Sequence, residues 1–210
     1  MPAAQRQQFL GIIVAETERL SRLVNQVLDM AKIESGHAEW RNADVDIGQL
    51  LAQAVQTTSE MFRERGARVQ LALPENPVVL RADPDRLMQV MLNLLSNAAK
   101  FVPQTAGCVE VTLATDPDGL HVAVQDNGPG VPLPQQALIF EKFRQGGDEL
   151  HRPQGTGLGL PISRQIVEHF GGRMWIESAP GQGARFVFQL PWRTQVEEPT
   201  RGHRAPGDTP

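Results

Sequence analysis

Two asparagines and a lysine occur at helical spacing in the stretch from Asn93 to Phe101, which reads N-L-L-S-N-A-A-K-F. Asn93 and Asn97 are four residues apart and Lys100 follows three residues later, so all three share one face of a helix. An amide oxygen can ligate Mg²⁺, and an ammonium group can bind a phosphate. The pattern predicts a site for a metal–phosphate pair, and the alternative for these residues alone is a solvated polar face.

A short glycine-rich stretch, Asp126-Asn-Gly-Pro-Gly130, follows a predicted strand. By itself it is typical of a turn. In the functional alternative, the Asp126 carboxylate accepts a hydrogen bond from a ligand amine. Gly128 and Gly130 would then let a planar ring approach the backbone.

A second glycine-rich stretch opens an apolar helix and consists of Gly155, Thr156, Gly157, Leu158 and Gly159. Clustered glycines before a helix leave backbone N–H groups free where the helix dipole favours an anion, so this is a candidate phosphate-binding segment. No Gly-Lys-Ser/Thr follows, which excludes a P-loop. Residues 145–154 are polar and loop-like rather than a strand, which excludes a Rossmann-type turn.

The stretch from Ile139 to Gly146 reads I-F-E-K-F-R-Q-G. Phe140 and Phe143 are candidate core anchors of a short helix, with Arg144 able to reach a phosphate. Simple packing with a surface arginine explains these residues equally well.

Three helices and six strands are expected to position these side chains. Helical periodicity covers residues 47–65, 84–101 and 158–170. Strand patterns cover residues 68–73, 78–82, 109–114, 120–125, 173–178 and 184–190. Because helices are interspersed with hairpins, the expected fold is an α/β two-layer sandwich with a mixed sheet of about five strands.

A long helix is predicted ahead of this region, over residues 5–34. Its apolar residues recur at alternating steps of three and four from Phe9 to Met30, and the pattern ends at Ser35-Gly36, a helix stop signal. The opposite face is polar and carries Arg19, Arg22, Gln26 and Lys32. A lone helix cannot bury its own apolar stripe, so we expect either homodimerisation through residues 5–34 or partial melting.

Composition and charge exclude several classes of protein. The 210 residues are 40% hydrophobic with a formal net charge of −4, so the chain can form a core and lacks the basic excess of a nucleic-acid-binding protein. The single cysteine, Cys108, excludes an internal disulfide and a cysteine-cluster metal site. Neither a membrane span nor a secretory signal is found, so a cytoplasmic location is expected. Residues 193–210 are expected to form a disordered tail.

Five stretches, taken in order, resemble the ATP-binding domain of sensor histidine kinases, in the ATPase superfamily shared with gyrase, the heat-shock chaperones and mismatch-repair proteins. They are N-x-x-x-N-A-x-K-F, D-N-G-P-G, F-x-x-F-R, G-T-G-L-G-L and a closing G-x-G-x-x-F from Gly181 to Phe186. The resemblance implies a Bergerat-type, or GHKL-type, ATP-binding fold over residues 45–192. Residues 1–36 resemble the second helix of the family's dimerisation hairpin, chiefly from Glu18 to Gly36.

The same resemblance implies ATP and Mg²⁺ as ligands and gives each motif residue a role. Catalytic roles at the phosphates fall to Asn93, Lys100 and Arg144, and Asn97 would ligate Mg²⁺. Asp126 would read the adenine amino group. The remaining nucleotide-binding residues would be Gly128, Gly130, Phe143, Gly155, Thr156, Gly157, Leu158 and Gly159. Arg144 and the residues up to Gln154 would belong to a mobile lid.

Two departures from the family pattern shape the expected function. The ATP-hydrolysing branches carry a water-activating glutamate where this chain has Asn93, and an amide cannot act as that base, which favours phosphotransfer to a protein side chain. The family's acceptor-histidine box is absent. Each histidine of the chain is better explained as a surface or capping residue: His37, His121, His151, His169 and His203.

The expected protein is the C-terminal catalytic portion of a two-component sensor histidine kinase, either a truncation or a short form. It would phosphorylate a histidine that this chain lacks. Expected partners are the acceptor-histidine helix of a kinase, a response regulator and a second copy of the chain. The alternatives are a non-catalytic ATP-dependent interaction module and a serine kinase of the anti-sigma-factor type, a branch that usually lacks the long helix.

Overall fold

The computed structural model describes residues 3–144 and 156–192. The expected tail at 193–210 lies outside these residues. The elements in chain order are α1 (Ala3–Glu34), β1 (Ala43–Asp46), α2 (Ile47–Glu64), β2 (Arg68–Ala72), β3 (Val79–Ala82), α3 (Pro84–Phe101), β4 (Cys108–Thr115), β5 (Gly119–Asp126), α4 (Leu133–Gln136), the 3₁₀ helix η1 (Leu138–Phe140), α5 (Gly159–His169), β6 (Arg173–Ser178) and β7 (Ala184–Pro191).

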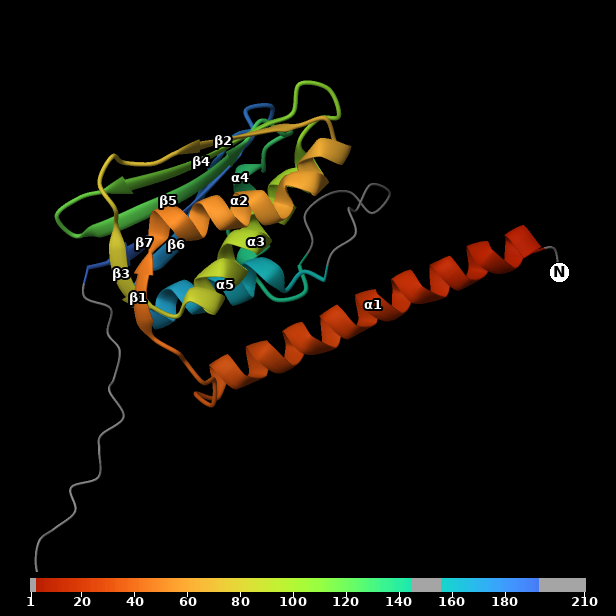
Figure 1. Cartoon of the computed structure of the whole chain (residues 1–210), viewed down its shortest axis with the longest axis horizontal. Coiled ribbons are helices and arrows are strands. Elements are labelled where there is room, and N and C mark those ends of the chain that lie inside the picture. Colours follow the sequence, from red (N-terminus) through yellow and green to blue (C-terminus); the bar gives the residue numbers. More distant parts are fainter. Residues whose placement is uncertain (1–2, 145–155, 193–210) are drawn as a thin grey trace, which may run out of the picture.

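A mixed five-stranded sheet forms one layer of the molecule. Its strand order is β2-β4-β5-β7-β6, and only the β2–β4 pair is parallel. Helices α2, α3 and α5 cover one face of this sheet (Figure 1). The core lies between the two layers, where the largest fully buried side chains include Phe62, Phe170 and Leu120. The predicted α/β two-layer sandwich is therefore confirmed.

Helix α3 is fixed at its start by its own sequence. The Asp83 carboxylate accepts hydrogen bonds from the backbone N–H groups of Asp85 (3.0 Å) and Arg86 (3.2 Å), and Pro84 occupies the first turn, where its missing N–H costs nothing. The apolar positions then recur at helical spacing and are all buried: Leu87, Val90, Met91, Leu94, Leu95 and Ala98. This buried face sets the rotation of α3, and with it the direction of the polar motif.

One expected strand lies outside the main sheet. Strand β3 pairs antiparallel with β1, a strand that the sequence analysis did not predict. The four residues of β1 read Ala-Asp-Val-Asp, which is too short and too acidic to show a strand pattern. Asp46, the last of them, caps α2 by accepting a hydrogen bond from the Gln49 N–H at 3.0 Å.

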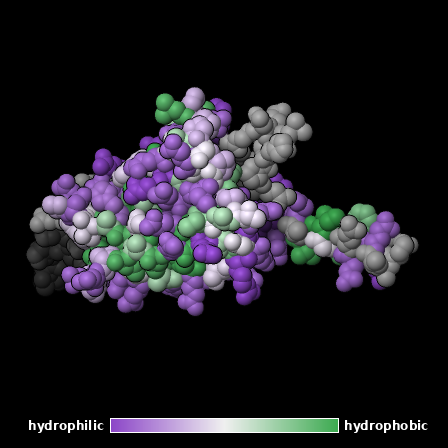
Figure 2. All heavy atoms as spheres, turned by 90° about the horizontal axis from the view of Figure 1, so that it is seen from above, coloured by the Kyte–Doolittle hydropathy of each residue, from purple (hydrophilic) through white to green (hydrophobic). Residues whose placement is uncertain are grey.

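Helix α1 extends well beyond the two-layer domain (Figure 1). Its C-terminal part, from Leu23 onward, packs against the domain, with Met30 buried and Leu23 and Ile33 partly buried at the core. Hydrophobic side chains lie exposed on the part that projects away (Figure 2). The exposed apolar residues of α1 are Phe9, Leu10, Ile12, Ile13, Val14, Leu20, Val24, Val27 and Leu28.

Within residues 3–144 and 156–192, none of the helices combines the length and the apolar character needed to cross a membrane.

Candidate functional site

Asn93 joins α3 to the start of α5. Its amide nitrogen donates to the backbone oxygen of Gly159 at 3.2 Å and to the hydroxyl of the buried Ser163 at 3.1 Å. A Cβ added at Gly159 would lie 3.3 Å from the Asn93 amide oxygen. The close approach of the two helices therefore depends on a small residue at position 159 and on an amide at position 93.

The other two polar residues of the α3 motif are half-buried. Within the described part of the chain, the side chain of Asn97 makes no hydrogen bond and that of Lys100 makes no ion pair. Burial lowers the pKa of Lys100, and the positive charge of Arg22 lowers it further. Both side chains are thus free to meet a ligand, and an anion would relieve the unfavourable environment of the ammonium group.

Asp126 is the last residue of β5, and its carboxylate is almost fully buried, with 5% of the residue exposed. Oδ1 accepts hydrogen bonds from the backbone N–H groups of Gly128 at 2.8 Å and Ala184 at 3.3 Å. Burial raises the pKa of Asp126, and these two hydrogen bonds oppose that shift. Oδ2 accepts no hydrogen bond from the described residues, so it is available to a donor on a ligand.

The glycines that follow Asp126 have a steric role within the protein. A Cβ at Gly128 would lie 2.7 Å from the backbone oxygen of Phe101, at the end of α3. Gly130 has a φ of 76°, and a Cβ there would lie 2.1 Å from the backbone oxygen of Ala179. The space beside both glycines is therefore filled by protein backbone, which explains the glycines without a ligand. Their predicted role beside an adenine ring stays a prediction.

Asn127, in the same turn, forms hydrogen bonds to the protein backbone. Its amide oxygen accepts from the Cys108 N–H at 2.9 Å, and its amide nitrogen donates to the backbone oxygen of Ala106 at 2.8 Å. These bonds tie the loop after α3 to the end of β5. The turn that carries Asp126 is thereby held against the C-terminal end of α3.

The second glycine-rich segment is described from Thr156 onward, and Gly155 lies outside the described residues. Gly157 has a φ of 71°, and a Cβ there would lie 2.8 Å from the carbonyl carbon of Phe143. Leu158, which precedes α5, supplies no capping side chain to the first turn of the helix. The backbone N–H groups of this turn therefore lack that usual partner, and a helix start of this kind favours an anion.

Phe140 and Phe143 have different environments. Phe140 packs against the core at the end of η1, as predicted. The prediction of Phe143 as a core anchor is wrong: 64% of the residue is exposed and its φ is 60°. The reason is that its backbone N–H donates to the Gly157 oxygen at 3.0 Å, and this pairing turns the side chain outward. Arg144 pairs with Glu141 at 3.1 Å on the surface, and its predicted phosphate contact stays a prediction.

Helix α1 contributes to the same region, which the sequence analysis did not predict. The Thr156 hydroxyl donates to the Gln26 amide oxygen at 2.6 Å. Glu34 forms an ion pair with Lys142 and accepts a hydrogen bond from Gln165 at 2.9 Å. The polar face of α1 looks like an ordinary solvated face in the sequence, and no local signal marks these residues as contacts.

The residue predicted to hold Mg²⁺ is an oxygen donor, the ligand type that this ion prefers. Within the described residues no three histidine, cysteine, aspartate or glutamate side chains gather to form a metal site. The Asn97 amide oxygen is the predicted ligand, and its unbonded side chain fits a cation that takes most of its ligands from water and phosphate.

Comparison with known proteins identifies the family. Residues 82–194 match the family of histidine kinase-, DNA gyrase B- and HSP90-like ATPases, and residues 2–36 match the His Kinase A phospho-acceptor domain. The circadian input-output histidine kinase CikA of Synechococcus elongatus is 37% identical over 200 residues, which are 93% of this chain and 26% of CikA. The chain thus spans about a quarter of that relative.

Solved structures of histidine kinases are also similar to this chain. Full-length ShkA in complex with AMPPNP matches 92% of this chain and 40% of its own, with a TM-score of 0.80 and 34% identity. The histidine kinase ThkA in complex with the response regulator TrrA shares the fold over 91% of this chain and 53% of its own, with a TM-score of 0.69 and 23% identity. The chain therefore belongs to the histidine kinase-, DNA gyrase B- and HSP90-like ATPases, and among them to the sensor histidine kinases.

Proposed function

We propose that this chain binds ATP with Mg²⁺ and transfers the γ-phosphoryl group to a histidine of a dimerisation hairpin on another polypeptide. The observation that carries the proposal is the buried Asp126 carboxylate, whose Oδ1 is held by two backbone N–H groups while Oδ2 accepts nothing from the described residues. An adenine amino group would donate a hydrogen bond to the Oδ2 atom that the described residues leave without a partner.

The proposed phosphate end of the site lies between α3 and the start of α5. Asn97 would hold Mg²⁺, Lys100 would bind a phosphate, and the first-turn N–H groups of α5 would bind others. In the transfer, a lone pair of the acceptor imidazole nitrogen forms a bond to the γ-phosphorus while the bond to the bridging oxygen breaks and ADP leaves. These residues would act by positioning the reactants and neutralising charge.

Transfer to a side chain is favoured over hydrolysis because Asn93 cannot activate water. Its amide has no basic lone pair of the kind a carboxylate offers, and its nitrogen already donates to Gly159 and Ser163. We infer that Asn93 fixes the phosphate end of the site through α5 and that Arg144 leaves Glu141 when nucleotide binds. Because ATP is the phosphoryl donor, we place the reaction in the cytoplasm.

The proposed partners are an acceptor-histidine helix, a response regulator and a second copy of the chain joined through residues 5–34. The match of residues 2–36 to the phospho-acceptor domain and the exposed apolar residues of α1 support the helical partners. The ThkA–TrrA complex supports a response regulator as a partner for this fold.

A non-catalytic ATP-dependent interaction module is the second candidate, and the described histidines favour it. The His169 ring stacks on Trp40 with centroids 3.6 Å apart, and His121 lies 2.6 Å from the Asp116 carboxylate. Of the other three, His37 is exposed after α1 and the remaining two lie outside the described residues. A serine kinase of the anti-sigma-factor type is less well supported, because the chain carries the long helix α1.

Binding is tested first, by calorimetry with ATP and Mg²⁺. We expect the wild type to bind and Asn97→Ala and Asp126→Ala to lose binding. Gly157→Ala should also weaken it, because its Cβ would clash with Phe143. Gly36→Ala is the matched control, since Gly36 has the same φ of 71° but no atom within 4 Å of a Cβ. A wild type that binds no nucleotide would refute the ATP site.

Transfer is tested next with ATP labelled at the γ-phosphate. A hairpin fragment that carries an intact acceptor histidine is added to one sample and omitted from another. Acid-labile label on the added fragment alone would establish a kinase module that acts on a supplied histidine. Nucleotide binding without any transfer would favour the interaction module.

A further inference from the structure

We propose that Ser163 is a positioning residue of the nucleotide site: its buried hydroxyl fixes the orientation of the Asn93 amide, so that the Asn93 amide oxygen is offered to Mg²⁺ and the water molecules around it. The proposal rests on the ATP site proposed above. It assigns a role to a residue of α5 that lies outside the five sequence motifs.

The hydroxyl of Ser163 bonds between two helices and not within its own. Ser163 lies in α5 and is fully buried, with 0% of the residue exposed. A hydroxyl on a helix commonly donates to a backbone oxygen of that helix, as Thr58 does on α2 with the Ala54 oxygen at 2.9 Å. Within the described residues, the Ser163 hydroxyl makes one hydrogen bond, which it accepts from the Asn93 side chain on α3 at 3.1 Å.

The second partner of the Asn93 amide nitrogen decides which way the amide faces. The backbone oxygen of Gly159, at 3.2 Å, can only accept a hydrogen bond, so the nitrogen of Asn93 must face it. The Ser163 hydroxyl then takes the second hydrogen of the same nitrogen. The amide therefore cannot turn over without breaking both hydrogen bonds, one of them to a fully buried hydroxyl.

The Asn93 amide oxygen is left without a partner among the residues that the structure describes. It lies beside the first residue of α5, 3.3 Å from the place that a Cβ of Gly159 would take. An amide oxygen and a phosphate oxygen are both acceptors, so the two do not bond to each other. The complementary group is a cation that prefers oxygen ligands and keeps several waters, as Mg²⁺ does.

The first test compares Ser163→Ala with Ser96→Ala in calorimetric titrations with ATP and Mg²⁺. Ser96 is the matched control because its hydroxyl donates to the backbone oxygen of Asn93, at 3.1 Å, and does not contact the amide. Ser163→Ala should weaken ATP binding about fivefold, which corresponds to the loss of one hydrogen bond. Ser163→Cys, which keeps the volume but is a weak acceptor, should show the same loss. Ser96→Ala should stay within about twofold of the wild type.

Further measurements separate positioning from support of the fold. In EDTA, without Mg²⁺, Ser163→Ala should bind ATP within about twofold of the wild type, because the Asn93 oxygen then has no cation to meet. In a double-mutant cycle with Mg²⁺ present, Asn93→Ala should weaken ATP binding more than Ser163→Ala does. The double variant should bind ATP no more weakly than Asn93→Ala alone, because Ser163 acts through the amide.

Three kinds of outcome overturn the inference. Wild-type ATP affinity in Ser163→Ala and Ser163→Cys removes Ser163 from the site. An equal loss with and without Mg²⁺, or additive losses in the double variant, assigns Ser163 to the packing of α5 alone. A wild type that binds no ATP refutes the proposed function as well, which distinguishes that failure from the first two.

Discussion

At the scale of single residues, Asp126 shows the cost of a binding group inside a core. The carboxylate is buried at the end of β5, and burial raises its pKa. In the folded chain at neutral pH, the ionised form is therefore less favourable than it is in the unfolded chain. The two hydrogen bonds from backbone N–H groups offset only part of this effect, so the residue favours binding over stability.

Asp126→Asn is expected to change the pH dependence of stability in a defined direction. The folded pKa of Asp126 lies above the unfolded value, so its contribution to stability is fully present below the unfolded pKa and is lost as the pH rises through the folded pKa. An asparagine does not titrate. The stability of the variant relative to the wild type should therefore rise from about pH 4 toward neutral pH, as measured by urea unfolding across that range.

Asp126→Asn should also bind ATP more weakly. Its amide N–H₂ group and the adenine amino group are both hydrogen-bond donors and cannot pair with each other. A stability difference that stays constant with pH would show that Asp126 does not titrate with a raised pKa. Unchanged ATP affinity would remove the residue from the proposed adenine contact.

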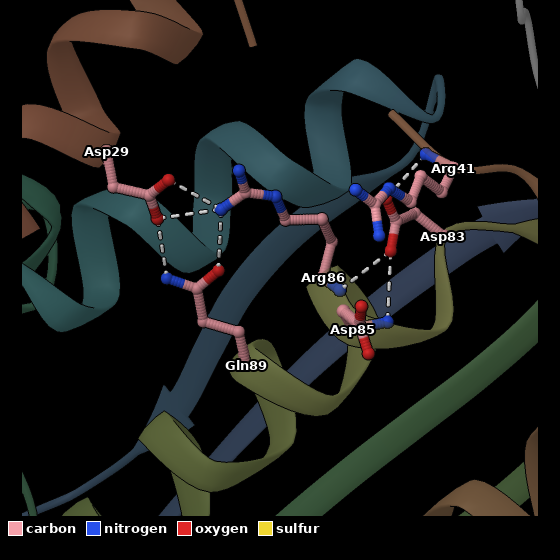
Figure 3. A network of polar contacts seen from close by, with 6 residues as sticks. All are labelled: Asp29, Arg41, Asp83, Asp85, Arg86 and Gln89. Carbon is pink, nitrogen blue, oxygen red and sulfur yellow. Dashed lines mark hydrogen bonds and ion pairs between the residues drawn. The ribbon is translucent and has the colours of Figure 1, made fainter. Parts of the chain in front are cut away.

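At the scale of secondary-structure elements, α1 and α3 are joined by one polar network. Asp29 on α1 binds Arg86 and Gln89 on α3, residues that are 57 and 60 positions away along the chain (Figure 3). Gln26 and Glu34 extend the contact to Thr156, just before α5, and to Gln165 in the middle of α5. The same helix thus touches both elements that frame the proposed phosphate site.

Reversing the charge at Asp29 should detach the C-terminal part of α1 from the domain. Reversing the charge at Arg86 as well should restore the contact between α1 and α3. We expect Asp29→Arg to speed amide hydrogen exchange in residues 23–34 by about five- to thirtyfold, the effect of a loss of about 1–2 kcal/mol. Adding Arg86→Asp should recover most of the protection, because Gln89 can donate or accept. Exchange is followed by mass spectrometry.

Glu60→Arg serves as the control for charge reversal, because Glu60 pairs with Arg63 on the exposed surface of α2. It should leave exchange in residues 23–34 unchanged. If the double reversal protects α1 no better than Asp29→Arg alone, the ion pair is not what holds the two helices together.

At the scale of the whole molecule, the two parts of α1 have different surroundings. Its C-terminal part, from Leu23 onward, packs against the domain, whereas the projecting part exposes a run of large apolar side chains (Figure 2). Patches of this kind mark interaction surfaces, and a second copy of the same helix offers a matching one. The exposed apolar side chains are therefore the surface through which the proposed dimerisation would occur.

Ile13→Glu combined with Leu20→Glu should convert a concentration-dependent dimer to a monomer in sedimentation equilibrium. Both residues are 60% exposed in the single chain, so the variant should leave the two-layer domain folded. Leu133→Glu on α4, another exposed leucine, is the control and should leave the dimer unchanged. A wild type that stays monomeric at every concentration would exclude the interface.

The sequence by itself determined most of the helices and strands and the order of the motifs. Helical spacing located α1, α2, α3 and α5, and strand patterns located the five strands of the main sheet, because both signals depend on neighbours a few residues apart. The motif residues on α3 and at the end of β5 were identified in the same way. These features determine the family, since motif order and spacing are properties of the chain alone.

Only the tertiary structure decided which side chains meet. Gln26 contacts Thr156 across 130 positions, and the close packing of Gly128 depends on where the end of α3 lies. The Phe143 side chain points outward because its backbone pairs with Gly157. Strand β3 pairs with β1 and not with a strand of the main sheet. Periodicity reports which face of an element is buried, but not what covers it, because contacts between distant segments are set by how the elements pack.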